Sequence, residues 1–203
     1  YDATEPAWLL NGGADWMVTE VEVYAPVGYS SVQPMLDEPE CGLTEIEFYG
    51  RCDHLVNSSW LFWQFLADTV GPEVLLKTMQ ASVELDGIDA LEAGLSALGL
   101  QLAEVWPAFV AANLAVGPRA DEQGYWFADR LEGVTATAEG KAVRDTRSYK
   151  ALSARYYRID HPGGELWLGT GGDPAALVVT VHPVDHGKSD GPLESGTGPF
   201  GLP

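Results

Sequence analysis

The side chains best suited to catalysis in this sequence are four histidines, His54, His161, His182 and His186. Histidine binds zinc and transfers protons near neutral pH. Zinc-dependent hydrolysis needs three protein ligands and one open position, so that the bound water has a pKa near ~7 and a carboxylate can take its proton. A His-Glu-x-x-His helix supplies two such ligands on one face, and no pair of histidines here forms that pattern. The sequence therefore does not identify a complete zinc site.

The two cysteines, Cys41 and Cys52, are separated by ten residues in a stretch that contains glycine and proline. Such a stretch can close on itself, so the pair predicts a disulfide and an oxidising compartment, either extracellular or periplasmic. One alternative is a pair of free thiols. The other is part of a zinc site, for which only His54 is near enough in sequence to add a ligand.

Acidic side chains gather in two short runs, Asp37-Glu38 with Glu40 and Glu45 with Glu47. Carboxylates of this kind bind calcium, but these runs lack the regular ligand spacing of a calcium loop. A solvated acidic loop is the preferred interpretation, and calcium binding is the alternative.

The charge of the chain excludes several classes of partner. The chain has 11 Lys and Arg against 30 Asp and Glu, a net charge of −19, which repels phosphate backbones and anionic lipid headgroups. Nucleic acid is therefore not expected as a partner, and because no run of 18 apolar residues occurs, membrane insertion is not expected either. Residues 1–117 hold 18 acids and two bases, whereas 118–203 hold 12 acids and nine bases. This asymmetry, −16 against −3, predicts two modules.

The first module, residues 1–117, is predicted to be a helical lobe. Apolar residues recur at three- and four-residue steps from about residue 6 to 23, with Met17 and Val21 on the core-facing stripe beside the tryptophans. An aromatic helix, capped at residues 57–59 and stopped at residues 70–72, is apolar all round and is predicted to lie at the buried centre. Further helices are predicted over 72–83, 88–99 and 102–116, with a kink or a late start at Trp106-Pro107. Residues 25–52 are predicted to be a long loop.

The second module, residues 118–184, is predicted to be a small antiparallel β-sandwich-like unit. Short segments rich in β-branched and aromatic residues, at 133–138, 142–149, 154–159, 165–169 and 177–182, alternate with Gly, Pro and Asp. Residues 185–203 are rich in Gly, Pro and Ser and are predicted to be a disordered tail or a linker. The expected fold class is α+β, a helical lobe followed by this β module.

The segment PAWLLNGGADW, residues 6–16, resembles the second metal-site helix of secreted gluzincin-type zinc metallopeptidases, whose pattern is roughly Pro-x-Trp-Leu-x-Glu-Gly-x-Ala-x-Trp. In that family the glutamate is the third zinc ligand, and Asn11 holds its position here. An aromatic helix ending in Val-Gly, further helices and a C-terminal β domain follow in such proteins, the order also predicted here over residues 5–182. Tyr49 and His54, between the two aromatic helices, match the place of groups that hydrogen-bond the tetrahedral oxyanion.

The resemblance implies an exported zinc metallopeptidase that acts on peptide or protein substrates, with zinc as its cofactor. A neutral amide such as that of Asn11 is a far weaker zinc ligand than a carboxylate. The chain is therefore expected to be a C-terminal portion of such an enzyme or a degenerate homologue, not catalytic by itself. The alternative is a noncatalytic extracellular binding or adhesion module that recognises glycan or protein through the β module.

Overall fold

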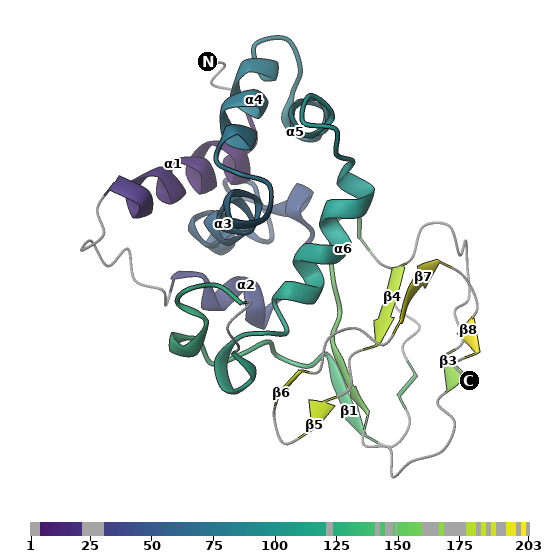
Figure 1. Cartoon of the computed structure of the whole chain (residues 1–203). Coiled ribbons are helices and arrows are strands. Elements are labelled where there is room, and N and C mark those ends of the chain that lie inside the picture. Colours follow the sequence, from purple (N-terminus) through teal and green to yellow (C-terminus); the bar gives the residue numbers. More distant parts are fainter. Residues whose placement is uncertain are drawn as a thin grey trace.

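A computed structural model of the chain describes residues 5–21, 31–120, 124–140, 143–144, 148, 150–159, 167–168, 178–181, 184–185, 188–189, 194–197 and 200–201. These residues form an α+β fold, in which the helices gather on one side and the strands on the other (Figure 1). The α-helices are α1 (Ala7–Val21), α2 (Gln33–Asp37), α3 (Trp60–Thr69), α4 (Glu73–Ala81), α5 (Gly87–Ser96) and α6 (Leu102–Ala112). Short 3-10 turns lie at Leu43–Glu45, Asp53–Leu55, Asn57–Ser59, Gly117–Arg119 and Ala128–Arg130.

The aromatic helix α3 lies at the centre of the helical part, as its sequence predicts (Figure 1). Its first seven residues, Trp60–Leu66, are all buried. Phe62 contacts Phe109 of α6 edge to face, at a ring-centroid distance of 5.1 Å, and Trp8 of α1 stacks on Trp63 at 6.1 Å. The central helix is therefore held from both sides by aromatic contacts, which stabilise beyond the area that they bury.

The ends of the predicted helices agree closely with the structure. Gly71, at a φ of +115°, and Pro72 separate α3 from α4, and Gly99, at +78°, follows α5. Glycine adopts these left-handed conformations without steric cost, which explains the stops. The late start considered at Trp106-Pro107 is wrong, because α6 begins at Leu102 and includes Pro107.

The predicted long loop contains a helix that sequence patterns did not indicate. The short α2 is held by hydrogen bonds from a segment about 100 residues away in the chain. The side chain of Gln33 donates to the carbonyl of Gly133 at 2.9 Å and accepts from the amide of Glu132 at 2.9 Å, while the amide of Thr135 donates to the carbonyl of Leu36 at 3.0 Å. These distant hydrogen bonds offset the cost of ordering a helix too short to be stable alone.

The helical core continues beyond the predicted boundary at residue 117. Tyr125, Phe127, Ala128 and Leu131 are buried in the same hydrophobic cluster as the tryptophans of α1 and α3. Phe127 contacts Trp60 at a ring-centroid distance of 5.3 Å. Residues 124–131 therefore pack as part of the helical lobe.

Within the described residues, the strands form four separate two-stranded ladders. β1 (Ala138–Gly140) pairs in parallel with β2 (Tyr157–Ile159). Three antiparallel pairs follow, β3 (Trp167–Leu168) with β8 (Phe200–Gly201), β4 (Val178–Val181) with β7 (Glu194–Thr197), and β5 (Val184–Asp185) with β6 (Lys188–Ser189).

The predicted antiparallel sandwich is not formed by the residues described. The first ladder is parallel, and strands of two to four residues in separate pairs do not build two facing sheets. β6, β7 and β8 lie in the segment predicted to be a tail or linker, and β7 pairs with β4 over four residues. Composition gave no sign of this pairing because backbone groups can form a ladder without apolar side chains. None of the described helices is long and apolar enough to cross a membrane.

Candidate functional site

The metallopeptidase-like segment forms most of α1, and two adjacent glycines fix its position. A Cβ atom on Gly12 would collide with the hydroxyl of Ser59, immediately before α3, and lie 3.1 Å from the ring of Trp63. A Cβ atom on Gly13 would lie 3.2 Å from the side-chain ends of Leu75 and Met79 in α4. Close helix packing therefore accounts for the glycine pair.

Buried hydrogen bonds hold the same crossing. The carbonyl of Trp8 accepts from the Ser59 hydroxyl and from the Trp63 indole nitrogen, both at 3.3 Å. At the start of α1, the Glu47 carboxylate accepts from the backbone amide of Ala7 at 3.3 Å. A carboxylate at this place also interacts favourably with the positive end of the helix macrodipole. Both interactions hold the N-terminal end of α1 in place.

Asn11 lies on the half-buried edge of this anchored helix. Asp15 follows it by four residues and lies on the same edge. The Oδ2 atom of Asp15 is shielded from solvent and has no hydrogen-bond partner among the described residues, and burial raises the pKa of this carboxyl. This edge of α1 is therefore polar, and the described residues leave the Oδ2 atom of Asp15 without a hydrogen bond.

The residues on the outer side of α1, opposite its buried face, are more exposed than predicted. Met17 and Val21 were predicted to face the core, but their side chains are 44% and 82% exposed, and Val18 is 41% exposed. Trp8, Leu9 and Trp16, which were predicted on the same stripe, are buried as expected. Because α1 is apolar on both sides, its periodicity alone does not indicate which side is buried.

The two candidate oxyanion-binding residues lie in different surroundings. Tyr49 is fully exposed at a turn, with a φ of +64°, and no described residue hydrogen-bonds its phenol. The Nε2 atom of His54 lies 2.9 Å from Glu38, and its Nδ1 atom lies 3.9 Å from Asp53. No hydrogen bond between described residues brings Tyr49, His54 or Asn11 together, and their catalytic role stays a prediction.

The predicted disulfide is confirmed. Cys41 and Cys52 are bonded, with their Cα atoms 6.2 Å apart, and both side chains are buried. The bond closes a loop that carries Glu47, the carboxylate that contacts the start of α1. Glu38 and His54, which contact each other, lie just outside the two ends of this loop. The disulfide therefore restricts the conformations of the loop beside α1.

The acidic runs that raised the possibility of calcium make contacts within the protein. Asp37 accepts hydrogen bonds from Gln33 at 3.0 Å and Thr135 at 2.9 Å, and Glu45 lies 3.1 Å from Lys150. Glu38 and Glu47 have the partners given above. Several of the carboxylates are thus used to join segments distant in sequence.

The donor groups around α1 do not fit zinc in the part of the chain that is described. No three His, Cys, Asp or Glu side chains come together there in a metal-binding arrangement. His161, His182 and His186 lie outside the described residues. Asn11 offers only a neutral amide, and Cys41 and Cys52 are engaged with each other.

A second polar group, which sequence reasoning missed, lies between α3, α6 and the segment after α6. The buried Tyr125 donates to Asn113 at 2.7 Å, and Tyr156 donates to the carbonyl of Val110 at 2.9 Å. Burial, with smaller contributions from Tyr156 and Asp68, raises the pKa of Tyr125 well above its usual value of 10.0. These hydrogen bonds join the chain after α6 to the helical core, and no local pattern could have indicated them.

Comparison of the chain with models of protein families, with curated proteins and with solved structures gave no significant match. The resemblance to metallopeptidases therefore depends on residues 6–16 and on the order of the helices. The alternative role in glycan or protein recognition depends on side chains of the β module, many of which lie outside the described residues.

Proposed function

We propose that the protein is an exported, noncatalytic relative of gluzincin-type zinc metallopeptidases that acts by binding instead of by hydrolysis. One observation carries the proposal: α1 has the helix pattern of the third zinc ligand and is firmly packed, but the ligand position is Asn11. The fold around this position is therefore compatible with the family's helix, while the chemistry of the side chain is not.

An amide in place of a carboxylate removes the charge that offsets a divalent ion. A zinc-bound water would need that ion to lower its pKa and a carboxylate to take its proton. Since no described group of side chains supplies the remaining ligands, we derive no hydrolytic step for this chain.

Export is supported by the disulfide, because such bonds form and persist in oxidising compartments. Extracellular or periplasmic location is therefore part of the proposal. The expected substrate of the resembled family, a peptide or protein, becomes a binding partner in this account.

Zinc titration by calorimetry, together with hydrolysis of a fluorogenic peptide library, tests the proposal. The unaltered protein and Asn11→Ala are expected to show neither micromolar zinc binding nor hydrolysis. Asn11→Glu is expected to bind no more zinc than Ala14→Glu, which adds the same charge at an exposed site of the same helix, because no described side chains supply the other two ligands. Micromolar zinc binding that Asn11→Ala abolishes, or hydrolysis that a chelator stops, would overturn the proposal.

A further inference from the structure

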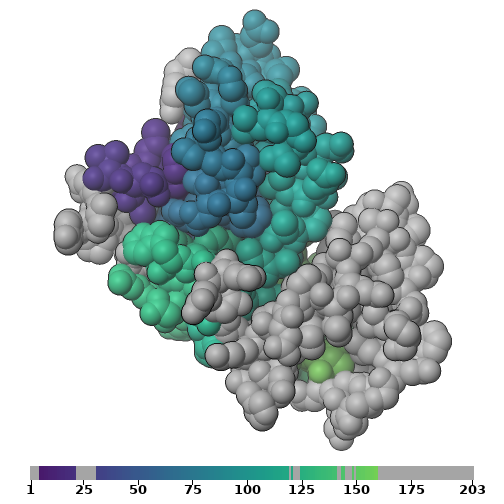
Figure 2. All heavy atoms as spheres, in the orientation of Figure 1, coloured from purple at the N-terminus to yellow at the C-terminus, as the bar shows by residue number. Residues whose placement is uncertain are grey.

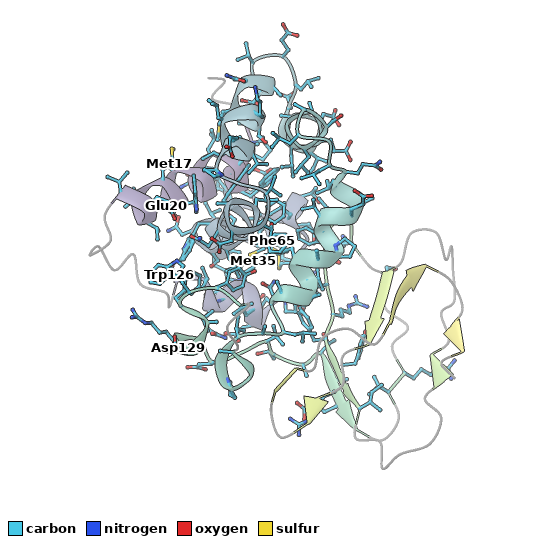
Figure 3. The ribbon with its side chains drawn as sticks, in the orientation of Figure 1. Met17, Glu20, Met35, Phe65, Trp126 and Asp129 are labelled. Carbon is cyan, nitrogen blue, oxygen red and sulfur yellow. A yellow bond between two sulfur atoms is a disulfide. The ribbon has the colours of Figure 1, made fainter. Side chains whose placement is uncertain are left out.

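The outer side of α1 carries a stripe of apolar residues that nothing in the described structure covers. Leu10, Ala14, Met17 and Val21 follow one another at steps of four, three and four residues, and Val18 lies beside them. This spacing is that of a helix that packs along another helix. Figure 2 shows α1, in purple, at the surface along one edge of the molecule, and Figure 3 places Met17 on its C-terminal half.

The apolar side chains of this stripe are more exposed than is usual for a helix at a protein surface. Met17, Val18 and Val21 are 44%, 41% and 82% exposed, Ala14 is exposed, and Leu10 is partly buried. An amphipathic surface helix carries polar residues on its outer side, whereas a helix that is apolar on both sides is normally covered on both. The small side chain of Ala14, midway along the stripe, would allow a second helix to approach closely.

Charge selects the kind of helix that fits. α1 contains no basic residue, and its acids, Asp15 and Glu20, flank the apolar stripe. The C-terminal end of α1 adds the negative end of its macrodipole, and no basic side chain occupies its last turn. A cationic side chain would be favoured on this edge.

A second copy of the chain would bring the wrong charge. Residues 1–117 carry a net charge of −16, so two copies that met through α1 would place acids against acids. We propose that the outer face of α1 is the docking site of a basic amphipathic helix supplied by another polypeptide. This inference rests on the proposed function, since it names the class of partner that the noncatalytic protein binds.

One helix face of this length forms a small interface. A contact well below ~1,000 Å² is typical of weak or transient complexes, so a dissociation constant in the micromolar range is expected. Because the partner is basic and the site is acidic, binding should weaken as salt is added.

The probe is a fluorescein-labelled peptide of about 18 residues, long enough to form a helix, with leucines at alternating four- and three-residue steps and lysines on its flanks. Two matched peptides accompany it: one has glutamate in place of lysine, and one has the same composition with the spacing scrambled. Fluorescence anisotropy measures binding to the whole chain.

The structure supplies a matched pair of variants. Val18→Ser with Val21→Ser removes two exposed apolar side chains from the outer face of α1. Val83→Ser with Leu85→Ser removes two others, 71% and 41% exposed, from the connection between α4 and α5. Far-UV circular dichroism checks that both proteins fold. Protection of residues 10–21 from hydrogen exchange on addition of the peptide tests the same site in the unaltered protein.

The inference predicts binding of the basic, regularly spaced peptide, a loss of about tenfold in the α1 variant and little change in the control variant. Equal binding of the scrambled peptide, equal loss in both variants, or no protection of residues 10–21 would overturn it. Sedimentation that shows a dimer lost in the α1 variant would overturn it too, in favour of a second copy. Failure of the peptide to bind leaves the zinc and hydrolysis results unaffected, so the two proposals fail separately.

Discussion

At the scale of single residues, the glycine pair of α1 shows how the candidate site is positioned. Gly12 faces backbone and a short hydroxyl side chain at the crossing with α3, whereas Gly13 faces only the flexible ends of Leu75 and Met79. The same substitution at these two neighbours should therefore have different consequences. Backbone cannot move aside as a methionine side chain can.

Gly12→Ala is expected to lower the free energy of unfolding by about 1–3 kcal/mol, because the added methyl overpacks the crossing. Alanine's better helix propensity, about 1 kcal/mol, offsets only part of this loss. Gly13→Ala is the control and is expected to be neutral or stabilising. Urea unfolding of both variants measures the difference, and equal stability of the two would contradict the packing described.

Asp15 predicts a pH dependence with a definite sign. Burial raises the pKa of its carboxyl above the ordinary value of 3.8. Well below pH 3.8 the carboxyl is protonated in both the folded and the unfolded chain, so its burial does not change the free energy of unfolding. As the pH rises between the two pKa values the unfolded chain loses its proton first, and the folded state loses stability.

Asp15→Asn is therefore expected to raise the free energy of unfolding at pH 7 relative to the unaltered protein, and this gain should disappear below pH 3.8. Urea unfolding across this pH range measures it. Glu20→Gln, which removes an exposed acid from the same helix, is the control. A gain that is the same at every pH would contradict desolvation as its cause.

At the scale of elements, the disulfide loop links the candidate site to the rest of the chain. Within the loop, the amide of Leu43 donates to the carbonyl of Leu152 at 2.9 Å; just before the loop, the carbonyl of Pro39 accepts from the amide of Ala154 at 2.8 Å. The loop also supplies Glu47 to the start of α1. A change in this loop should therefore affect both α1 and the segment before β2.

Replacing Cys41 and Cys52 together with alanine is expected to lower the free energy of unfolding by about 3 kcal/mol, the value typical of a short closed loop. Thermal unfolding measures the loss. The unaltered protein in reducing agent should show a similar loss, whereas the alanine variant should not respond to the reductant. A reductant-insensitive unaltered protein would contradict a stabilising role for the bond.

Some elements could be predicted from sequence and others could not, for identifiable reasons. α4 to α6 have apolar residues at helical spacing, and α3 is an apolar run that follows capping residues. Gly71, Pro72 and Gly99 mark helix ends. α2 could not be predicted because hydrogen bonds from residues 132–135 support it. The side of α1 that is buried was ambiguous because both sides are apolar. The pairing of β7 with β4 depends on backbone groups, which composition does not report.

At the scale of the whole molecule, the chain combines strong negative charge with a helix that has Asn11 where the pattern it resembles has a glutamate. Of the candidate site residues, the cysteine pair could be found from spacing, and Asn11 from its motif. The contacts of His54 and the exposure of Tyr49 depend on tertiary structure, so no local pattern indicated them. The charge of −19 favours basic partners for the molecule as a whole.

The most direct test of whether Asn11 has replaced a zinc ligand is the zinc content of the folded chain, measured by native mass spectrometry after equilibration with micromolar zinc. We expect the unaltered protein and Asn11→Ala to retain equally little zinc, because an amide at this position does not replace the charged ligand. One zinc ion per unaltered chain, absent from Asn11→Ala, would contradict it.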